Sequence, residues 1–136
     1  MSNILIITNN KKILELEAQY QCIKVDYMNI SVREILRCVQ ERLASDSLVL
    51  LCNPLCGRSA RPFPYISLML SDIDSKYSSG SSEETNISMW NDIMTFEMMD
   101  EKNKKVYEEY SKDILEDFAV LDKDLVENGV RIIQSA

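Results

Sequence analysis

Near its amino terminus the chain reads Ile4-Leu-Ile-Ile-Thr-Asn-Asn10, four apolar residues followed at once by three polar ones. Isoleucine favours strands because its branched side chain packs well on a pleated surface. A continuous apolar run of this length is typical of a strand buried on both faces, and Thr-Asn-Asn suits the polar loop after such a strand. The sequence therefore predicts a buried strand over residues 4–7 whose carboxyl end is polar.

Helix and strand patterns alternate in the residues that follow. A short helix is expected within residues 11–20, and residues 22–28 alternate apolar and polar positions, the pattern of a half-exposed outer strand. Ser31-Val-Arg-Glu34 is typical of a capping box, and the apolar spacing after it predicts a helix over residues 32–44. Residues 48–52 predict a third, buried strand. This alternating order favours parallel strands joined by right-handed crossovers.

The second half of the chain does not continue this alternation. Tyr65–Leu70 looks like a fourth strand, and the polar, serine-rich residues 71–85 have the composition of a mobile surface loop. Apolar residues at helical spacing then predict a helix over about residues 104–127. Asn128-Gly129 resembles a C-terminal helix cap, so Val130–Ile133 would return as a last strand.

The length of 136 residues is typical of one domain. We therefore expect a single α/β domain over residues 1–136, built on a small mixed, mainly parallel sheet of four or five strands. Helices would flank this sheet and make up most of the C-terminal half.

The composition excludes several classes of protein. The chain has 22 acidic and 15 basic residues, a formal charge of −7, and no basic stripe, which argues against binding nucleic acid or anionic membranes. Its apolar runs are far shorter than the roughly 20 residues of a membrane span, and its start lacks the organisation of a signal peptide. The four cysteines are then best interpreted as reduced thiols, and the expected location is the cytoplasm.

The segment after the third predicted strand contrasts with this acidic balance. It reads Asn53-Pro-Leu-Cys-Gly-Arg-Ser-Ala-Arg-Pro-Phe-Pro-Tyr65 and holds all three prolines of the chain. It carries Arg58 and Arg61, and no acidic residue occurs between Ser47 and Ser71. Guanidinium groups and backbone N–H groups beside a glycine suit a carboxylate or phosphate. The alternative is a proline-stiffened connection whose arginines pair with surface acids.

The predicted topology brings this segment to the polar end of the first strand. In open α/β sheets, ligands bind outside the carboxyl ends of parallel strands. That edge would receive Asn9 and Asn10 from the first strand, and Asn53 and Gly57 with both arginines from the third. The two neighbouring asparagines could orient a small anionic ligand, although asparagine is also a routine turn residue after a strand.

Catalytic and metal-binding patterns are weak. The chain has no histidine, which removes Ser-His and Cys-His mechanisms and leaves the cysteines without metal-ligand spacing. Cys52 and Cys56 form a C-x₃-C pair near positive charge, but ordinary thiols explain them better than a redox pair does. Nucleotide-binding glycine motifs are absent. We therefore expect no metal and no cofactor, and no residue is assigned a catalytic role.

Two stretches carry a family resemblance. The opening Ile4-Leu-Ile-Ile-Thr-Asn-Asn10, and Asn53-Pro-Leu-Cys-Gly-Arg-Ser59 followed by Pro62 and Pro64-Tyr65-Ile-Ser67, resemble the GrdX family. These small proteins are associated with the glycine, sarcosine and betaine reductase systems of anaerobic amino-acid fermenters. The family pattern has histidine where this chain has Asn53, so an amide hydrogen bond rather than acid–base chemistry is expected there. The resemblance adds Ser59 and Tyr65 to the candidate site.

Three classes of function remain open at this point. The resemblance implies an accessory protein of amino-acid reductase metabolism, which would bind a small carboxylate or phosphate at the sheet edge. The second class is a protein-interaction module whose acidic, Met-rich C-terminal helices bind a reductase-system protein. The third is a small thiol-dependent enzyme that uses Cys52 or Cys56. The sequence does not predict the oligomeric state.

Overall fold

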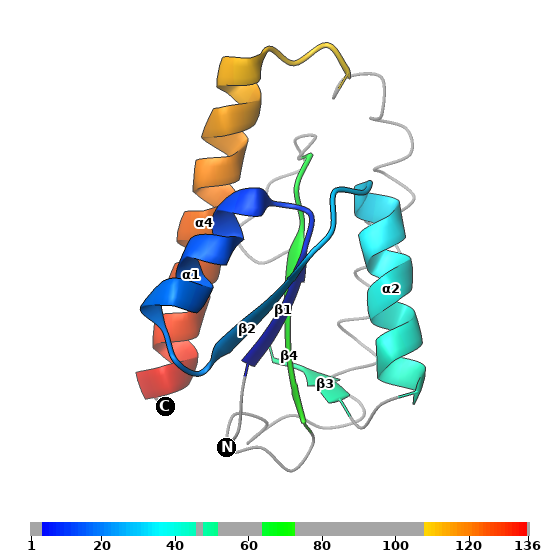
Figure 1. Ribbon diagram of the computed structural model, residues 1–136, viewed down its shortest axis with the longest axis vertical. Helices are drawn as coiled ribbons and strands as arrows, with labels where there is room; N and C mark the ends of the chain where they lie inside the picture. Colours follow the sequence, from blue (N-terminus) through cyan, green and yellow to red (C-terminus); the bar gives the residue numbers. More distant parts are fainter. Residues whose placement is uncertain (1–3, 46–47, 52–63, 73–107, 136) are drawn as a thin grey trace.

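The computed structural model describes residues 4–45, 48–51, 64–72 and 108–135 (Figure 1). The strands are β1 (Ile4–Thr8), β2 (Ile23–Tyr27), β3 (Leu48–Leu50) and β4 (Ser67–Asp72). The helices are the 3₁₀ turn η1 (Lys11–Ile13), α1 (Leu14–Gln19), α2 (Val32–Ser45) and α4 (Lys112–Ser135). The expected mixture of strands and helices is therefore confirmed.

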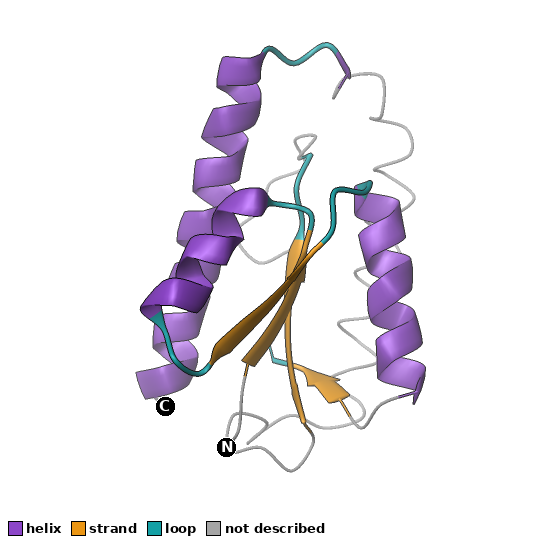
Figure 2. Ribbon diagram, in the orientation of Figure 1, coloured by secondary structure: helices purple, strands orange, loops and turns teal. Residues whose placement is uncertain are grey.

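The four strands form one sheet in the order β2-β1-β4-β3 (Figure 2). Only β1 and β2 pair in parallel, with Ile4 opposite Ile23. β4 is antiparallel to both β1 and β3. The expectation of a mainly parallel sheet is therefore wrong. The reason is that β3 and β4, which are consecutive in the chain, pair directly in antiparallel fashion, and β4 inserts between β1 and β3.

Helices cover both faces of this sheet. α2 lies on one side, and α1 and α4 lie on the other (Figure 1). β1 supplies both cores because its side chains alternate, with Ile7 packed toward α2 and Ile4 and Ile6 packed toward α1 and α4. The central position of β1 explains why residues 4–7 form a nearly continuous apolar run.

The capping residues of α2 behave as the sequence predicted. The Ser31 hydroxyl oxygen accepts a hydrogen bond from the Glu34 backbone N–H at 3.2 Å, and the hydroxyl donates to the Glu34 carboxylate at 3.1 Å. These bonds satisfy a backbone donor that would otherwise have no partner in the first turn.

α4 continues through the position where a helix end was expected. Both the predicted cap at Asn128-Gly129 and the predicted last strand at 130–133 are wrong. A Cβ atom on Gly129 would lie 2.7 Å from Met69 Cε, so the glycine allows α4 to approach β4 closely. Val126 and Val130, one helical turn apart, are both buried against the sheet and hold this part of the helix in place.

The remaining predictions for the second half lie largely outside the described residues. β4 runs as far as Asp72, and residues 73–107 are not described. No helix of the described chain is long and apolar enough to cross a membrane.

Candidate functional site

The polar residues at the end of β1 are buried. Thr8 is the last residue of β1, and Asn9 and Asn10 follow it beside the carboxyl end of the parallel strand β2; little of their surface is exposed. A buried polar group costs free energy unless it is hydrogen-bonded. The position of these three side chains therefore depends on the partners that they find.

Asn9 connects β1 to two other segments. Its side-chain N–H₂ group donates to the Ile30 carbonyl at 3.1 Å and to the Pro64 carbonyl at 3.2 Å. Its side-chain oxygen accepts from the Ile66 backbone N–H at 2.9 Å. Asn9 thus fixes the chain just before α2 and just before β4, and both of its amide hydrogens are donated within the protein.

Asn10 connects β1 to η1 and α4. Its side-chain oxygen accepts from the Lys12 backbone N–H at 3.1 Å, which caps η1. Its N–H₂ group donates to the Ala119 carbonyl at 2.8 Å and to Asp122 Oδ2 at 3.0 Å. The Asn10 side chain therefore both forms the turn into η1 and holds α4 in position.

Asp122 is a fully buried carboxylate on the inner face of α4. Besides the Asn10 amide, the Ser67 hydroxyl donates to its Oδ2 at 2.7 Å. Because Ser67 uses its one hydroxyl hydrogen on Asp122, the Thr8 hydroxyl hydrogen is shared between Ser67 Oγ at 2.7 Å and the Ile66 carbonyl at 3.2 Å. We call Thr8, Asn10, Ser67 and Asp122 the Asp122 cluster, which joins β1, β4 and α4.

A cleft of about 530 Å³ opens beside this cluster. Its lining comes from the carboxyl ends of β1 and β2, the η1–α1 segment, the residues before β4, and α4. Its lining residues include Asn9, Asn10, Lys11, Lys12, Glu15, Tyr27, Tyr65 and Glu116. The cleft therefore lies at an edge of the sheet where the only parallel strand pair of the described residues ends.

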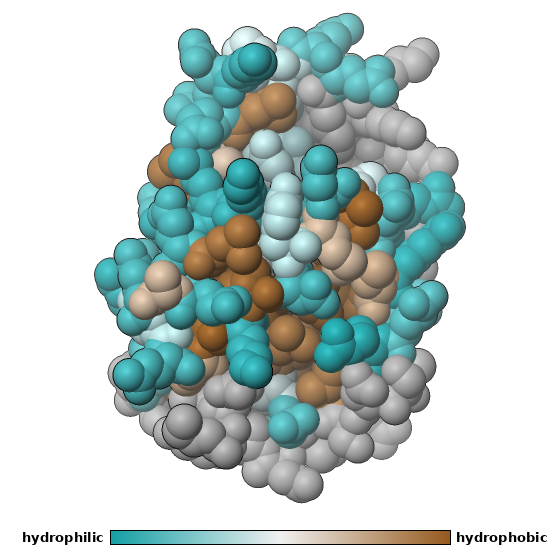
Figure 3. Space-filling view, in the orientation of Figure 1, coloured by the Kyte–Doolittle hydropathy of each residue, from teal (hydrophilic) through white to brown (hydrophobic). Residues whose placement is uncertain are grey.

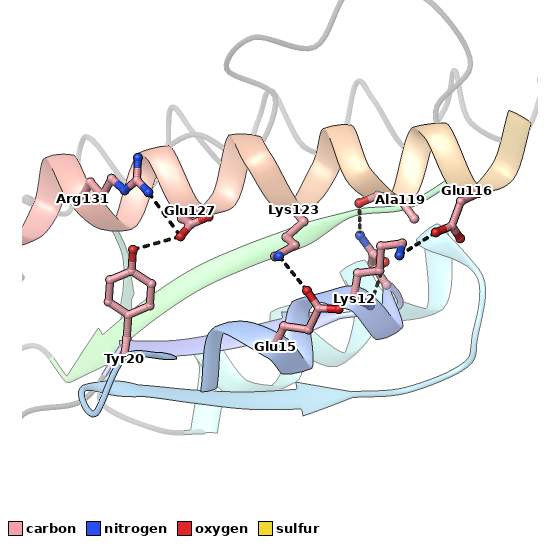
Figure 4. A network of polar contacts seen from close by, with 9 residues as sticks. Lys12, Glu15, Tyr20, Glu116, Ala119, Lys123, Glu127 and Arg131 are labelled. Atoms are coloured by element: carbon pink, nitrogen blue, oxygen red, sulfur yellow. Dashed lines mark hydrogen bonds and ion pairs between the residues drawn. The ribbon is translucent and has the colours of Figure 1, made fainter. Parts of the chain in front are cut away.

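Ion pairs cross the rim between η1–α1 and α4. Lys12 Nζ lies 2.5 Å from Glu116 Oε1, and Lys123 Nζ lies 2.6 Å from Glu15 Oε2 (Figure 4). The hydrogen bond to Glu116 raises the pKa of Lys12. The hydrogen bond from Lys123 lowers the pKa of Glu15, and the same bond raises the pKa of Lys123. Further along, the Tyr20 hydroxyl donates to Glu127 Oε2 at 3.0 Å.

Lys11 differs from the other lysines of the rim. It lines the cleft and is exposed, and it forms no ion pair with another described residue. The rim glutamates Glu15 and Glu116 are each bonded to a lysine of another element. Lys11 is therefore the cleft lysine whose charge is most accessible to an anion.

Tyr65 contributes a neutral hydroxyl group to the cleft. Partial burial raises the pKa of its phenol, with smaller contributions from the charge of Glu116 and other nearby acidic groups. The hydroxyl therefore stays protonated at neutral pH and can act as a hydrogen-bond donor or acceptor.

The comparisons with known proteins identify a family. A family model described as GrdX-like protein matches residues 5–131. The chain belongs to the GrdX-like family. No curated protein and no solved structure matches the chain. The matched range begins in β1 and ends in α4, so it includes at least part of every described element and all the residues of the cleft.

The structure brings three of the predicted site residues of this GrdX-like protein together. Asn9, Asn10 and Tyr65 line one cleft. The other candidates lie outside the described residues, as do Cys52 and Cys56; they are Asn53, Gly57, Arg58, Ser59 and Arg61. Among the described residues, no cluster of three or more His, Cys, Asp or Glu side chains could hold a metal ion.

Sequence reasoning missed Ser67 and Asp122. One signal of Asp122 was available, because it lies three residues after Ala119 and four before Val126, both on the buried face of α4. A carboxylate in such a row requires a buried hydrogen-bond partner. The identity of that partner was not readable, because Ser67 and Asn10 are 55 and 112 residues away in the chain.

Proposed function

We propose that this GrdX-like protein is an accessory protein of amino-acid reductase metabolism, namely of the glycine, sarcosine and betaine reductase systems. In this proposal the protein binds a small carboxylate or phosphate. The observation that supports a ligand is the cleft of about 530 Å³ at the carboxyl ends of β1 and β2. Ligands of open α/β sheets collect at this kind of edge, and pockets of roughly 300–1,000 Å³ are typical for small molecules. Family membership supports the metabolic context.

The surroundings of the cleft favour a ligand with hydrogen-bonding groups. The aromatic rings of Tyr27 and Tyr65 line it, and the Tyr65 hydroxyl remains neutral. Beneath them, Asn9 and Asn10 use their amide hydrogens within the protein. In this proposal the asparagines hold the floor of the cleft in place, while the rim residues make most of the contacts with the ligand.

Positive charge would come from Lys11 and from the arginines of the proline-rich segment. Lys11 is exposed at the cleft. Arg61 precedes Pro64 by three residues, and the Pro64 carbonyl accepts a hydrogen bond from Asn9. A guanidinium group can bind a carboxylate or phosphate through two hydrogen bonds, so Arg58 and Arg61 are the proposed anion-binding residues.

Calorimetric titration tests this proposal. Acetate, glycine and inorganic phosphate would each be titrated into the native chain and into the Arg58→Ala, Arg61→Ala and Lys11→Ala variants. A charge-assisted hydrogen bond contributes about 1.5–3 kcal/mol, so loss of a contacting arginine should weaken binding by roughly 10- to 150-fold. Loss of the exposed Lys11 should have a smaller effect, on the order of 2- to 10-fold.

Lys24→Ala is the matched control. Lys24 is an exposed lysine in β2 that does not line the cleft, so its removal changes the net charge equally without removing a proposed contact. If the ligand affinity falls equally in Lys24→Ala and Arg61→Ala, Arg61 acts only through the net charge of the protein and does not contact the ligand. Absence of binding to the native chain across the three probes would contradict the proposal.

A further inference from the structure

α4 carries a second apolar stripe besides the face that it buries. Ile114, Leu121, Leu125 and Ile132 are between 36% and 62% exposed. We call these four residues the outer stripe. Their spacings are seven, four and seven residues, which is the heptad spacing of helices that pack along a common seam. Apolar groups also reach the surface over the upper part of α4 in Figure 3.

The outer stripe does not belong to the core of the sheet. The buried row of α4 consists of Ala119, Asp122, Val126 and Val130. Successive residues of an α-helix are rotated by about 100°, so Leu121 and Leu125 project to one side of that row. A helix needs only one apolar stripe to pack on its own sheet, and a second one indicates another contact.

We propose that the outer stripe is the contact of a homodimer in which two α4 helices pack antiparallel about a two-fold axis. The spacings of seven, four and seven read the same from either end of the stripe. An antiparallel pairing therefore places Leu121 opposite Leu125 of the second copy, and Ile114 opposite Ile132 of the second copy. A symmetric contact of this kind is self-complementary, as two-fold interfaces must be.

The charges beside the stripe favour a second copy in this orientation. Asp117, Asp124 and Arg131 are exposed and follow one another at seven-residue spacing along the outer side of the stripe. Antiparallel helices bring Arg131 toward Asp117 of the second copy, and symmetry repeats this pair, while Asp124 faces Asp124 of the second copy once at the two-fold axis. Two attractive contacts therefore outnumber one repulsive contact. In a parallel pair, each of these three charged residues would instead lie level with the same residue of the second copy, so that like charges would meet. Arg131 also lies 3.5 Å from Glu127, and its five N–H donors can serve both carboxylates.

The contact is small and separate from the cleft. From Ile114 to Ile132 the stripe extends about 27 Å at 1.5 Å per residue. One helix pair of this length falls in the size range of weak interfaces, so we expect a dimer that dissociates at roughly micromolar concentration. Glu116, which lines the cleft, is nine residues from Leu125 and so lies on the opposite side of α4. Dimer formation and ligand binding can therefore be measured independently.

Sedimentation equilibrium of the full chain over a range from about 1 to 500 μM tests the proposal. The native chain should change from monomer to dimer within that range. Leu121→Asp and Leu125→Asp should each weaken the dimer by at least about 100-fold, because every substitution removes two apolar contacts from the symmetric interface. Val120→Ser is the matched control, since Val120 is an exposed apolar residue of α4 outside the stripe. Its dimer should be unchanged.

Charge reversal tests the orientation. Asp117→Arg and Arg131→Asp should each weaken the dimer several-fold, and the two substitutions together should restore it, because the exchanged charges still meet in an antiparallel pair. Failure of the double variant to recover would contradict the antiparallel arrangement. A native chain that stays monomeric throughout would overturn the dimer.

Discussion

α4 is attached to the rest of the protein by inner and outer polar contacts that differ mainly in burial. Inside, the Asp122 carboxylate receives hydrogen bonds from Asn10 and Ser67 and has no exposed surface. Outside, the pairs Lys12–Glu116 and Lys123–Glu15 join the same layers at the surface. Water and salt screen exposed ion pairs, so breaking one costs little. When a buried contact is broken, its partners have no water to replace the lost hydrogen bond, so the cost is larger. The inner contacts should therefore fix the position of α4 beside the cleft.

The largest effect is expected from Asp122→Ala. Asn10 and Ser67 would each lose a buried acceptor, and every orphaned donor costs about 1–3 kcal/mol, so the free energy of unfolding should fall by about 2–6 kcal/mol. Urea denaturation followed by circular dichroism measures this change. Asp124→Ala is the control, since it removes an exposed carboxylate from the same helix. Equal losses in the two variants would refute the importance of burial.

A smaller effect is expected from Asn10→Ala. This variant removes the cap of η1 and two donors to α4, but Ser67 still donates to Asp122, so the expected loss is about 1–3 kcal/mol. The same denaturation experiment measures the loss. Combining Asn10→Ala with Asp122→Ala sharpens the comparison, because contacting residues should give a double variant that loses less than the sum of the single losses. Simple additivity would show that the two side chains act independently.

The smallest effect is expected from Lys123→Ala, which removes an outer contact. The lowered pKa of Glu15 means that this pair stabilises the fold above about pH 4.3 and that the contribution is lost as the pH falls through the folded-state pKa. The raised pKa of Lys123 means that the contribution is complete below about pH 10.4 and is lost as the pH rises further.

The difference between native and Lys123→Ala stability should therefore be small and constant from about pH 5.5 to 9.5 and should disappear at both extremes. Thermal unfolding at a series of pH values checks this. Addition of 1 M salt should also reduce the difference. A loss as large as that of Asp122→Ala, or one that does not begin to decline as the pH falls below about 4.3, would show that the outer pairs contribute more than expected.

The parts of the fold that were predicted from sequence depend on local patterns. The apolar run at residues 4–7 and the Ser31 capping box lead to β1 and α2 because neighbouring residues determine a buried strand and a helix start. β2 was also readable, since its alternation reflects one covered face.

The parts that were missed depend on contacts between distant segments. The insertion of β4 between β1 and β3 is a choice of strand partner, which local pattern does not contain. Gly129 resembled a helix end, whereas the structure uses it to bring α4 close to Met69. The candidate site shows the same difference between local and distant contacts. Asn9 and Asn10 could be predicted because they directly follow a strand, whereas the Ser67–Asp122 hydrogen bond joins residues far apart in sequence.

The most direct test of the proposed function is to locate the ligand by NMR. Acetate, glycine and inorganic phosphate would be added in turn to the ¹⁵N-labelled chain. The account predicts saturable shifts of the backbone amides of Asn10, Lys12 and Tyr65 with at least one of these three probes, and none at Gln40, an exposed residue of α2. Shifts centred away from the cleft, or no saturable shifts with any probe, would contradict a small-anion site at the carboxyl end of β1.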